Sequence, residues 1–329
     1  MKKLFIFIHL LSFVTLVSSA AIKDPVDTNL IMYGRGLYPG DDSTYEHLRE
    51  AGFQTIVLSS FYIKANGDLY SGDDNKNPII HNGKYVGDRE WLRRVASLKK
   101  GSVKRIEILF EGRWYNQPAN TFDHIENWTY FAKPDSGIVT GTGVGSTLYN
   151  MCKVLKDEVG ADAICIDDEC VYNSESIAQL GEMIGGLNMH MSLCPFKKYE
   201  YWKDIICRSK PGLIDAVYIQ CYDGGRRNAP AQWKAGLQSD IPVYPIFLCR
   251  GAFSTCSSTH NSKSPAEMKA DMIRFKQDYP ELRGGAVWQM ADVKGYVKRG
   301  CAVSTPESGT ATTEQEYLNQ LIDSLKAAL

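Results

Sequence analysis

Eight short apolar segments alternate with eight segments of helical pattern along the 329-residue chain, and this alternation predicts a single (β/α)8 barrel. The apolar segments are rich in β-branched and aromatic residues, which favours parallel strands that are buried on both faces. The rival fold is an open doubly wound sheet, which requires a glycine-rich turn that begins a helix directly after the first strand. Residues 34–39 (Gly-Arg-Gly-Leu-Tyr-Pro) begin no helix, so the barrel is favoured.

The predicted elements follow one another in regular order. The strands are expected at 30–34, 55–61, 105–110, 163–167, 189–193, 216–220, 243–248 and 285–290. The helices that follow them are expected at 43–51, 88–98, 145–159, 174–184, 199–206, 230–237, 264–278 and 313–329. Two long segments rich in Gly, Asn and Asp, 63–87 and 111–145, are expected to be loops over the carboxyl-terminal face of the barrel, where such folds build their sites.

The N-terminus has the pattern of an export signal. Lys2 and Lys3 precede an apolar run over residues 4–17, and small residues follow at 18–20. We expect residues 1–20 to be a cleaved signal peptide, residues 22–329 to form the barrel domain, and the protein to be secreted, outside the cell or into a periplasm. An uncleaved membrane anchor is the alternative, but the apolar run is short for one. No later segment is long and apolar enough to span a bilayer.

Charge and cysteine content narrow the function classes. The net charge of −1 argues against electrostatic binding of nucleic acid. The nine cysteines are an odd number, so at least one thiol is expected to be unpaired or to pair between chains. No cysteine spacing resembles a zinc site, and we expect no metal and no cofactor. A disulfide between Cys249 and Cys256 is left open. Four cysteines lie in predicted strands and are expected to be buried thiols: Cys165, Cys194, Cys221 and Cys249.

The fourth predicted strand ends in acidic residues. Side chains alternate along a strand, so Cys165, Asp167 and Glu169 share one side, and the two carboxylates are separated by about 6.5–7 Å along the chain. Both would point into the barrel mouth. A carboxylate beside a carboxylic acid raises the pKa of that acid, which suits a general acid. A solvated acidic loop after the strand is the alternative.

These residues resemble a known family. The pattern Asp162-x-x-Cys165-x-Asp167-x-Glu169 resembles the DxxDxDxE signature of glycoside hydrolase family 18, the chitinases and endo-β-N-acetylglucosaminidases. Further similar segments follow in the family's order and extend the resemblance over most of residues 29–292: Met191-Ser192-Leu193-Cys194-Pro195, Gln220-Cys221-Tyr222-Asp223 and Trp288.

The resemblance implies a retaining hydrolase of β-1,4-linked N-acetylglucosamine glycans, such as chitin oligomers, peptidoglycan or N-glycan cores. In that family the N-acetyl oxygen of the substrate is the nucleophile. Glu169 would be the general acid, Asp167 would orient the acetamide and Tyr222 would bond its carbonyl. The remaining residues expected to bind substrate are Trp288 as the floor beneath the sugar, Gln220 and Asp223 as walls, and Tyr33, Met191 and Glu111.

The sequence departs from the family pattern in three places. Cys165 replaces the middle aspartate, Asp168 replaces an aromatic residue, and residues 110–114 (Phe-Glu-Gly-Arg-Trp) replace Ser-x-Gly-Gly. Without a carboxylate at 165, Asp167 is expected to remain ionised to lower pH.

Two other functions stay open at this point. One is a sugar-binding barrel without catalysis, although such proteins usually lack the catalytic glutamate and Glu169 is present. The other is a divalent-metal enzyme that uses the oxygen ligands of Asp167, Asp168 and Glu169.

Overall fold

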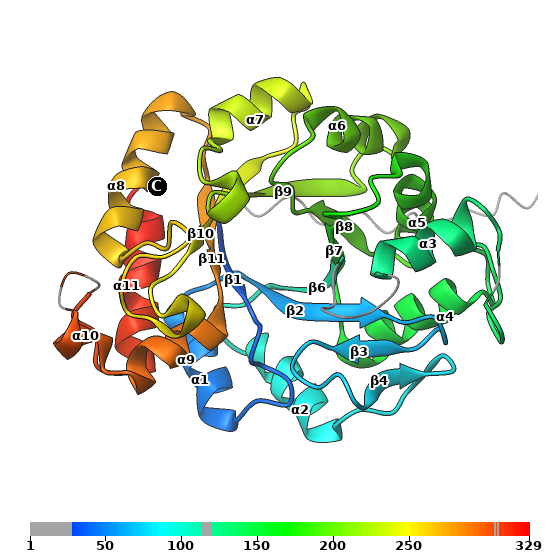
Figure 1. The fold of residues 1–329 in the computed structure, drawn as a ribbon, viewed down its shortest axis with the longest axis horizontal. Helices are drawn as coiled ribbons and strands as arrows, with labels where there is room; N and C mark the ends of the chain where they lie inside the picture. The colour runs from blue at the N-terminus through cyan, green and yellow to red at the C-terminus, as the bar shows by residue number, and fades with distance from the viewer. Residues whose placement is uncertain (1–27, 113–119, 134, 306, 308) are drawn as a thin grey trace, which may run out of the picture.

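A computed structural model describes residues 28–112, 120–133, 135–305, 307 and 309–329, so the predicted signal peptide lies outside the described residues. Eight parallel strands form a closed ring, because β1 pairs with both β2 and β11 (Figure 1). The predicted (β/α)8 barrel is confirmed. In ring order the strands are β1 (Asn29–Tyr33), β11 (Gly284–Trp288), β10 (Val243–Leu248), β9 (Ile214–Gln220), β8 (His190–Leu193), β7 (Ala163–Asp167), β6 (Arg105–Glu111) and β2 (Thr55–Ile63).

Helices cover the outside of this ring (Figure 1). The eight that sequence predicts are present as α1 (Asp42–Ala51), α2 (Arg89–Leu98), α4 (Thr147–Val154) with its π-helical extension η1 (Leu155–Val159), α5 (Ser174–Gly186), α6 (Tyr199–Arg208), α7 (Pro230–Leu237), α8 (Pro265–Asp278) and α11 (Glu314–Lys326). Local sequence explains their starts. At α8, for example, the Ser264 side chain accepts the Glu267 N–H while the Glu267 carboxylate accepts the Ser264 N–H, which satisfies both donors.

Strand alternation divides the core into two parts. One side of each strand packs against the helices, and the other fills the barrel interior. The interior residues include Ile31, Val57, Leu109, Cys165, Tyr218, Ile246 and Ala286. The next interior position along each strand lies at the carboxyl-terminal mouth of the barrel, so this register decides which side chains can reach the site.

A buried charged cluster occupies the lower part of the barrel interior. The Glu107 carboxylate accepts hydrogen bonds from Arg105 Nε at 2.6 Å, Tyr218 OH at 2.7 Å and Ser192 Oγ at 2.5 Å. Arg105 also donates two hydrogen bonds, of 2.5 and 2.8 Å, to Asp215. Because β6, β8 and β9 all contribute, a register shift in any of them would leave a buried charge without its partner.

Several elements were not predicted. Within 63–87 lie the antiparallel strands β3 (Leu69–Ser71), β4 (Pro78–His81) and β5 (Lys84–Tyr85), which extend the sheet from the projecting end of β2. Within 111–145 lies α3 (Thr121–Thr129). After the eighth strand come α9 (Met290–Lys298) and α10 (Cys301–Ser304), and two short 3-10 turns are η2 (Asp223–Gly225) and η3 (Ala252–Ser254). Among the described residues, no helix is long and apolar enough to cross a membrane.

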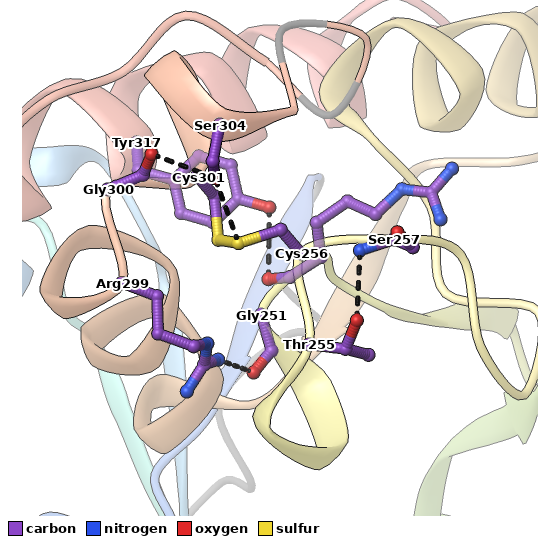
Figure 2. The surroundings of a disulfide bond; sticks show 10 residues. Gly251, Thr255, Cys256, Ser257, Arg299, Gly300, Cys301, Ser304 and Tyr317 are labelled. Carbon is purple, nitrogen blue, oxygen red and sulfur yellow. Dashed lines mark hydrogen bonds between the residues drawn. A yellow bond between two sulfur atoms is a disulfide. The ribbon is translucent and has the colours of Figure 1, made fainter.

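One disulfide joins two segments that are far apart in sequence. Cys256, after β10, is bonded to Cys301 at the start of α10, 45 residues later (Figure 2). The open alternative, a bond between Cys249 and Cys256, is wrong, because Cys249 stays a buried thiol. All four cysteines predicted to be buried thiols are so: Cys165, Cys194, Cys221 and Cys249.

Candidate active site

Asp167 and Glu169 meet at the barrel mouth and share a donor. The Gln220 Nε2 amide lies 3.1 Å from Asp167 Oδ1 and 3.1 Å from Glu169 Oε1, so it donates to both carboxylates. Asp167 is 4% exposed, whereas Glu169 lies in the exposed rim. One carboxyl is therefore set deep in the barrel and the other at its entrance.

Glu111 adds a third carboxyl group to this site. In the register of β6 and β7, Leu109 lies opposite Cys165 and Glu111 lies opposite Asp167. Leu109 and Cys165 both fill the barrel interior, so the residues two positions further along, Glu111 and Asp167, face the mouth from adjacent strands. The Glu111 carboxyl is buried, and Ser60, Tyr62 and Arg35 lie close enough to influence its pKa.

Neighbouring carboxylates influence the ionisation of Asp167 and Glu111. Burial raises the pKa of Asp167 well above its ordinary value, and the Glu169 and Glu111 carboxylates raise it further. Burial also raises the pKa of Glu111, although the neighbouring Ser60, Arg35 and Tyr62 oppose that rise. The sequence led us to expect that Asp167 remains ionised to lower pH because residue 165 carries no carboxylate, whereas burial, Glu169 and Glu111 act on its pKa in the opposite direction.

An aromatic floor lies beside the carboxyl groups. The Tyr33 and Trp288 rings are 5.1 Å apart between centroids, and the Tyr222 and Trp288 rings are 6.3 Å apart. Tyr222 and Trp288 are half-buried, so part of each side chain is accessible. Burial raises the pKa of Tyr222 well above its ordinary value, which keeps its hydroxyl group protonated and able to donate a hydrogen bond.

The remaining predicted residues lie at different distances from this centre. Tyr33 is fully buried beneath Trp288, where its hydroxyl group donates to Cys194 Sγ at 3.5 Å and lies 3.9 Å from Cys165 Sγ. Met191 does not join the site, because it is buried in the outer core, where β8 packs near Gly181 of α5. Asp223 is exposed, and its Oδ1 lies 3.2 Å from His260 Nδ1.

Asp168 stabilises the backbone turn after β7 and is not placed to bind a metal ion. Its buried carboxylate accepts the backbone N–H groups of Cys170, Val171 and Tyr172 at 2.7–3.0 Å and the Tyr201 hydroxyl group at 2.7 Å. These bonds shape the turn after β7 and use its acceptor capacity. In the part of the chain that the structure describes, no group of three or more His, Cys, Asp or Glu side chains could hold a metal ion. The alternative metal site at Asp167, Asp168 and Glu169 is therefore not formed.

Some polar residues at the mouth were not predicted. Gln289 follows Trp288, and its Oε1 atom is buried without a hydrogen-bond partner among the described residues. Burial raises the pKa of nearby Asp292 to about 6, while Gln289, Arg299 and Arg35 oppose the rise. Gln289 and Asp292 follow the end of β11, and this position after a strand is the only sequence feature that could have predicted them.

Comparison with solved structures relates the chain to barrel enzymes. Active domain 2 of a thermostable chitinase from Pyrococcus furiosus superposes with a TM-score of 0.53 at 10% identity, covering 92% of this chain and 96% of that one. The spore cortex-lytic enzyme SleL of Bacillus cereus gives 0.50 at 9% identity, covering 91% and 74%. An α-amylase from Geobacillus thermoleovorans gives 0.50 at 12% identity, covering 92% and 79%.

At such identities the similarity shows a shared TIM-barrel fold. No protein-family model and no curated protein sequence matches the chain. Any conclusion on activity must therefore come from the site itself, since this fold hosts many unrelated reactions.

Proposed function

We propose that the protein is an exported retaining glycosidase that cleaves β-1,4-linked N-acetylglucosamine glycans with the help of the substrate's own N-acetyl group. The observation that carries the proposal is the Gln220 amide shared by Asp167 and Glu169, close to Tyr222, whose ring in turn lies 6.3 Å from that of Trp288. It keeps a deep carboxyl and an exposed carboxyl together at the mouth of the barrel. The resemblance of the fourth-strand residues to family 18 supports the same reading.

In the proposed first step, exposed Glu169 gives its proton to the glycosidic oxygen. The bond between this oxygen and the anomeric carbon breaks as the acetamide carbonyl oxygen forms a bond to that carbon. Asp167 accepts the acetamide N–H and balances the positive charge of the resulting oxazolinium ion. The protonated Tyr222 hydroxyl group donates to the acetamide oxygen, and Trp288 stacks beneath the sugar.

In the second step, water attacks the anomeric carbon and gives its proton to the Glu169 carboxylate. The bond to the acetamide oxygen breaks, and the sugar keeps its original anomeric configuration. The exposed position of Glu169 supports this double role, because the same carboxyl must reach the leaving group and then water. The buried position of Asp167 suits a group that only orients and stabilises.

The test is hydrolysis of chitohexaose by the wild-type protein and by Glu169→Gln. This change removes the transferable proton while keeping the size of the side chain. General acid catalysis is worth about 10²–10⁴-fold, so kcat should fall by at least that range. The matched control is Glu182→Gln, the same chemical change on the exposed surface of α5, and it should hydrolyse at the wild-type rate. An active Glu169→Gln protein would remove Glu169 from the mechanism.

A further inference from the structure

The loop between β10 and α8 is held firmly at the carboxyl-terminal face of the barrel. The Cys256–Cys301 disulfide ties it to α10 (Figure 2). The Tyr317 hydroxyl group donates to the Arg250 carbonyl at 3.2 Å. At its base, Cys249 pairs with Lys263 as an isolated parallel bridge. Residues 249–263, here called the β10 loop, are therefore fixed at both ends and in the middle.

The same loop is attached to the strand end that carries Tyr222. The Asp223 N–H donates to the His260 carbonyl at 2.9 Å, and Asn261 Nδ2 donates to the Cys221 carbonyl at 3.0 Å. His260 Nδ1 also lies 3.2 Å from Asp223 Oδ1. Because Cys221 and Asp223 flank Tyr222, these bonds place the β10 loop at the edge of the candidate active site.

An aromatic ring stands exposed on this anchored loop. Phe253 is 63% exposed, although burying its apolar ring would stabilise the folded protein. Its centroid lies 4.3 Å from that of the His260 ring, at an interplanar angle of 32°, so His260 supports the phenyl ring. Phe253 also has left-handed backbone angles (φ 51°, ψ 34°), which bulky residues rarely adopt. The loop thus holds the ring outward instead of burying it.

We propose that Phe253 and His260 form an accessory sugar-binding platform for a glycan unit beyond the one stacked on Trp288. The inference rests on the proposed function and extends it to long glycan chains. The C–H face of a pyranose ring can pack on the exposed phenyl ring through dispersion and weak C–H contacts. The exposed Asp223 carboxylate beside His260 can accept hydrogen bonds from the hydroxyl groups of the same sugar.

The experiment measures dissociation constants by titration calorimetry for chitobiose and chitohexaose. The proteins carry Glu169→Gln so that the glycans stay intact. In this background, Phe253→Leu keeps an apolar side chain but removes the flat ring, whereas Phe253→Tyr keeps the ring. Phe131→Ala is the control for an exposed aromatic ring elsewhere on the protein. Phe131 is exposed and follows α3, in the segment after β6. In the ring of strands β6 lies opposite β10.

The expected result is a chain-length effect. Phe253→Leu should weaken chitohexaose binding about 3- to 10-fold more than chitobiose binding, while Phe253→Tyr and Phe131→Ala should not. Equal effects of Phe253→Leu on both glycans, or a similar chain-length effect of Phe131→Ala, would overturn the platform and leave the proposed function standing. A parent Glu169→Gln protein that binds neither glycan would overturn both.

Discussion

Asp167 shares the barrel mouth with Glu111 and Glu169, and this grouping sets how the site responds to pH. Both neighbours raise the pKa of Asp167 beyond the effect of burial. In the proposed mechanism the ionised form of Asp167 stabilises the oxazolinium ion, so activity is lost as Asp167 becomes protonated on the acid side. Because the charges on Glu111 and Glu169 act on Asp167, the acid limb depends on all three side chains.

Replacing Glu111 tests this coupling. Glu111→Gln removes one negative charge next to Asp167, so the pKa of Asp167 should fall and the acid limb of the kcat/KM profile should move to lower pH. The measurement is kcat/KM against pH on one soluble chitooligosaccharide, with folding checked by circular dichroism. If the acid limbs of the folded variant and the wild type coincide, Glu111 does not tune Asp167.

The alternation of side chains between the two faces of a strand explains which site residues the sequence could predict. Asp167, Gln220, Tyr222 and Trp288 continue interior positions of their strands, and the structure places them together. Met191 does not follow this pattern. Its neighbour Ser192 pairs with the interior residue Cys165, so Met191 points to the opposite face, into the outer core. Which residues of β8 face the interior depends on its pairing with β7, and the sequence of β8 alone does not reveal that pairing.

At the scale of elements, hydrophobic patterns located all eight barrel strands and the helices between them. They missed β3 to β5 because these strands are short and lie among turn-forming residues. They also missed the pairing of Cys256 with Cys301. Nothing local links cysteines 45 residues apart, and the β10 loop and α10 become neighbours only when the barrel closes.

This disulfide should contribute to stability as well as to the position of the β10 loop. The double variant Cys256→Ser, Cys301→Ser frees a long loop in the unfolded chain, which should lower the free energy of unfolding by about 2–4 kcal/mol. Urea denaturation of both proteins measures the difference. An unchanged midpoint and slope would show that the bond does not stabilise the folded state.

At the scale of the whole molecule, the barrel is the scaffold and the strand ends carry the candidate site. Solved barrels at 9–12% identity share the fold, and their reactions do not transfer to this chain. The proposed activity therefore depends on the arrangement of Asp167, Glu169 and Tyr222. In the proposed mechanism the substrate, not the protein, supplies the nucleophile.

The most direct measurement compares hydrolysis of chitotetraose with hydrolysis of its fully de-N-acetylated counterpart by the same protein. The two glycans have the same backbone and linkages and differ in the acetamide groups. If the acetamide is the nucleophile, kcat/KM should be at least ~10²-fold higher for chitotetraose. Comparable cleavage of both glycans, or a covalent glycosyl adduct on Asp167 or Glu169 in mass spectra of the reaction mixture, would contradict the account.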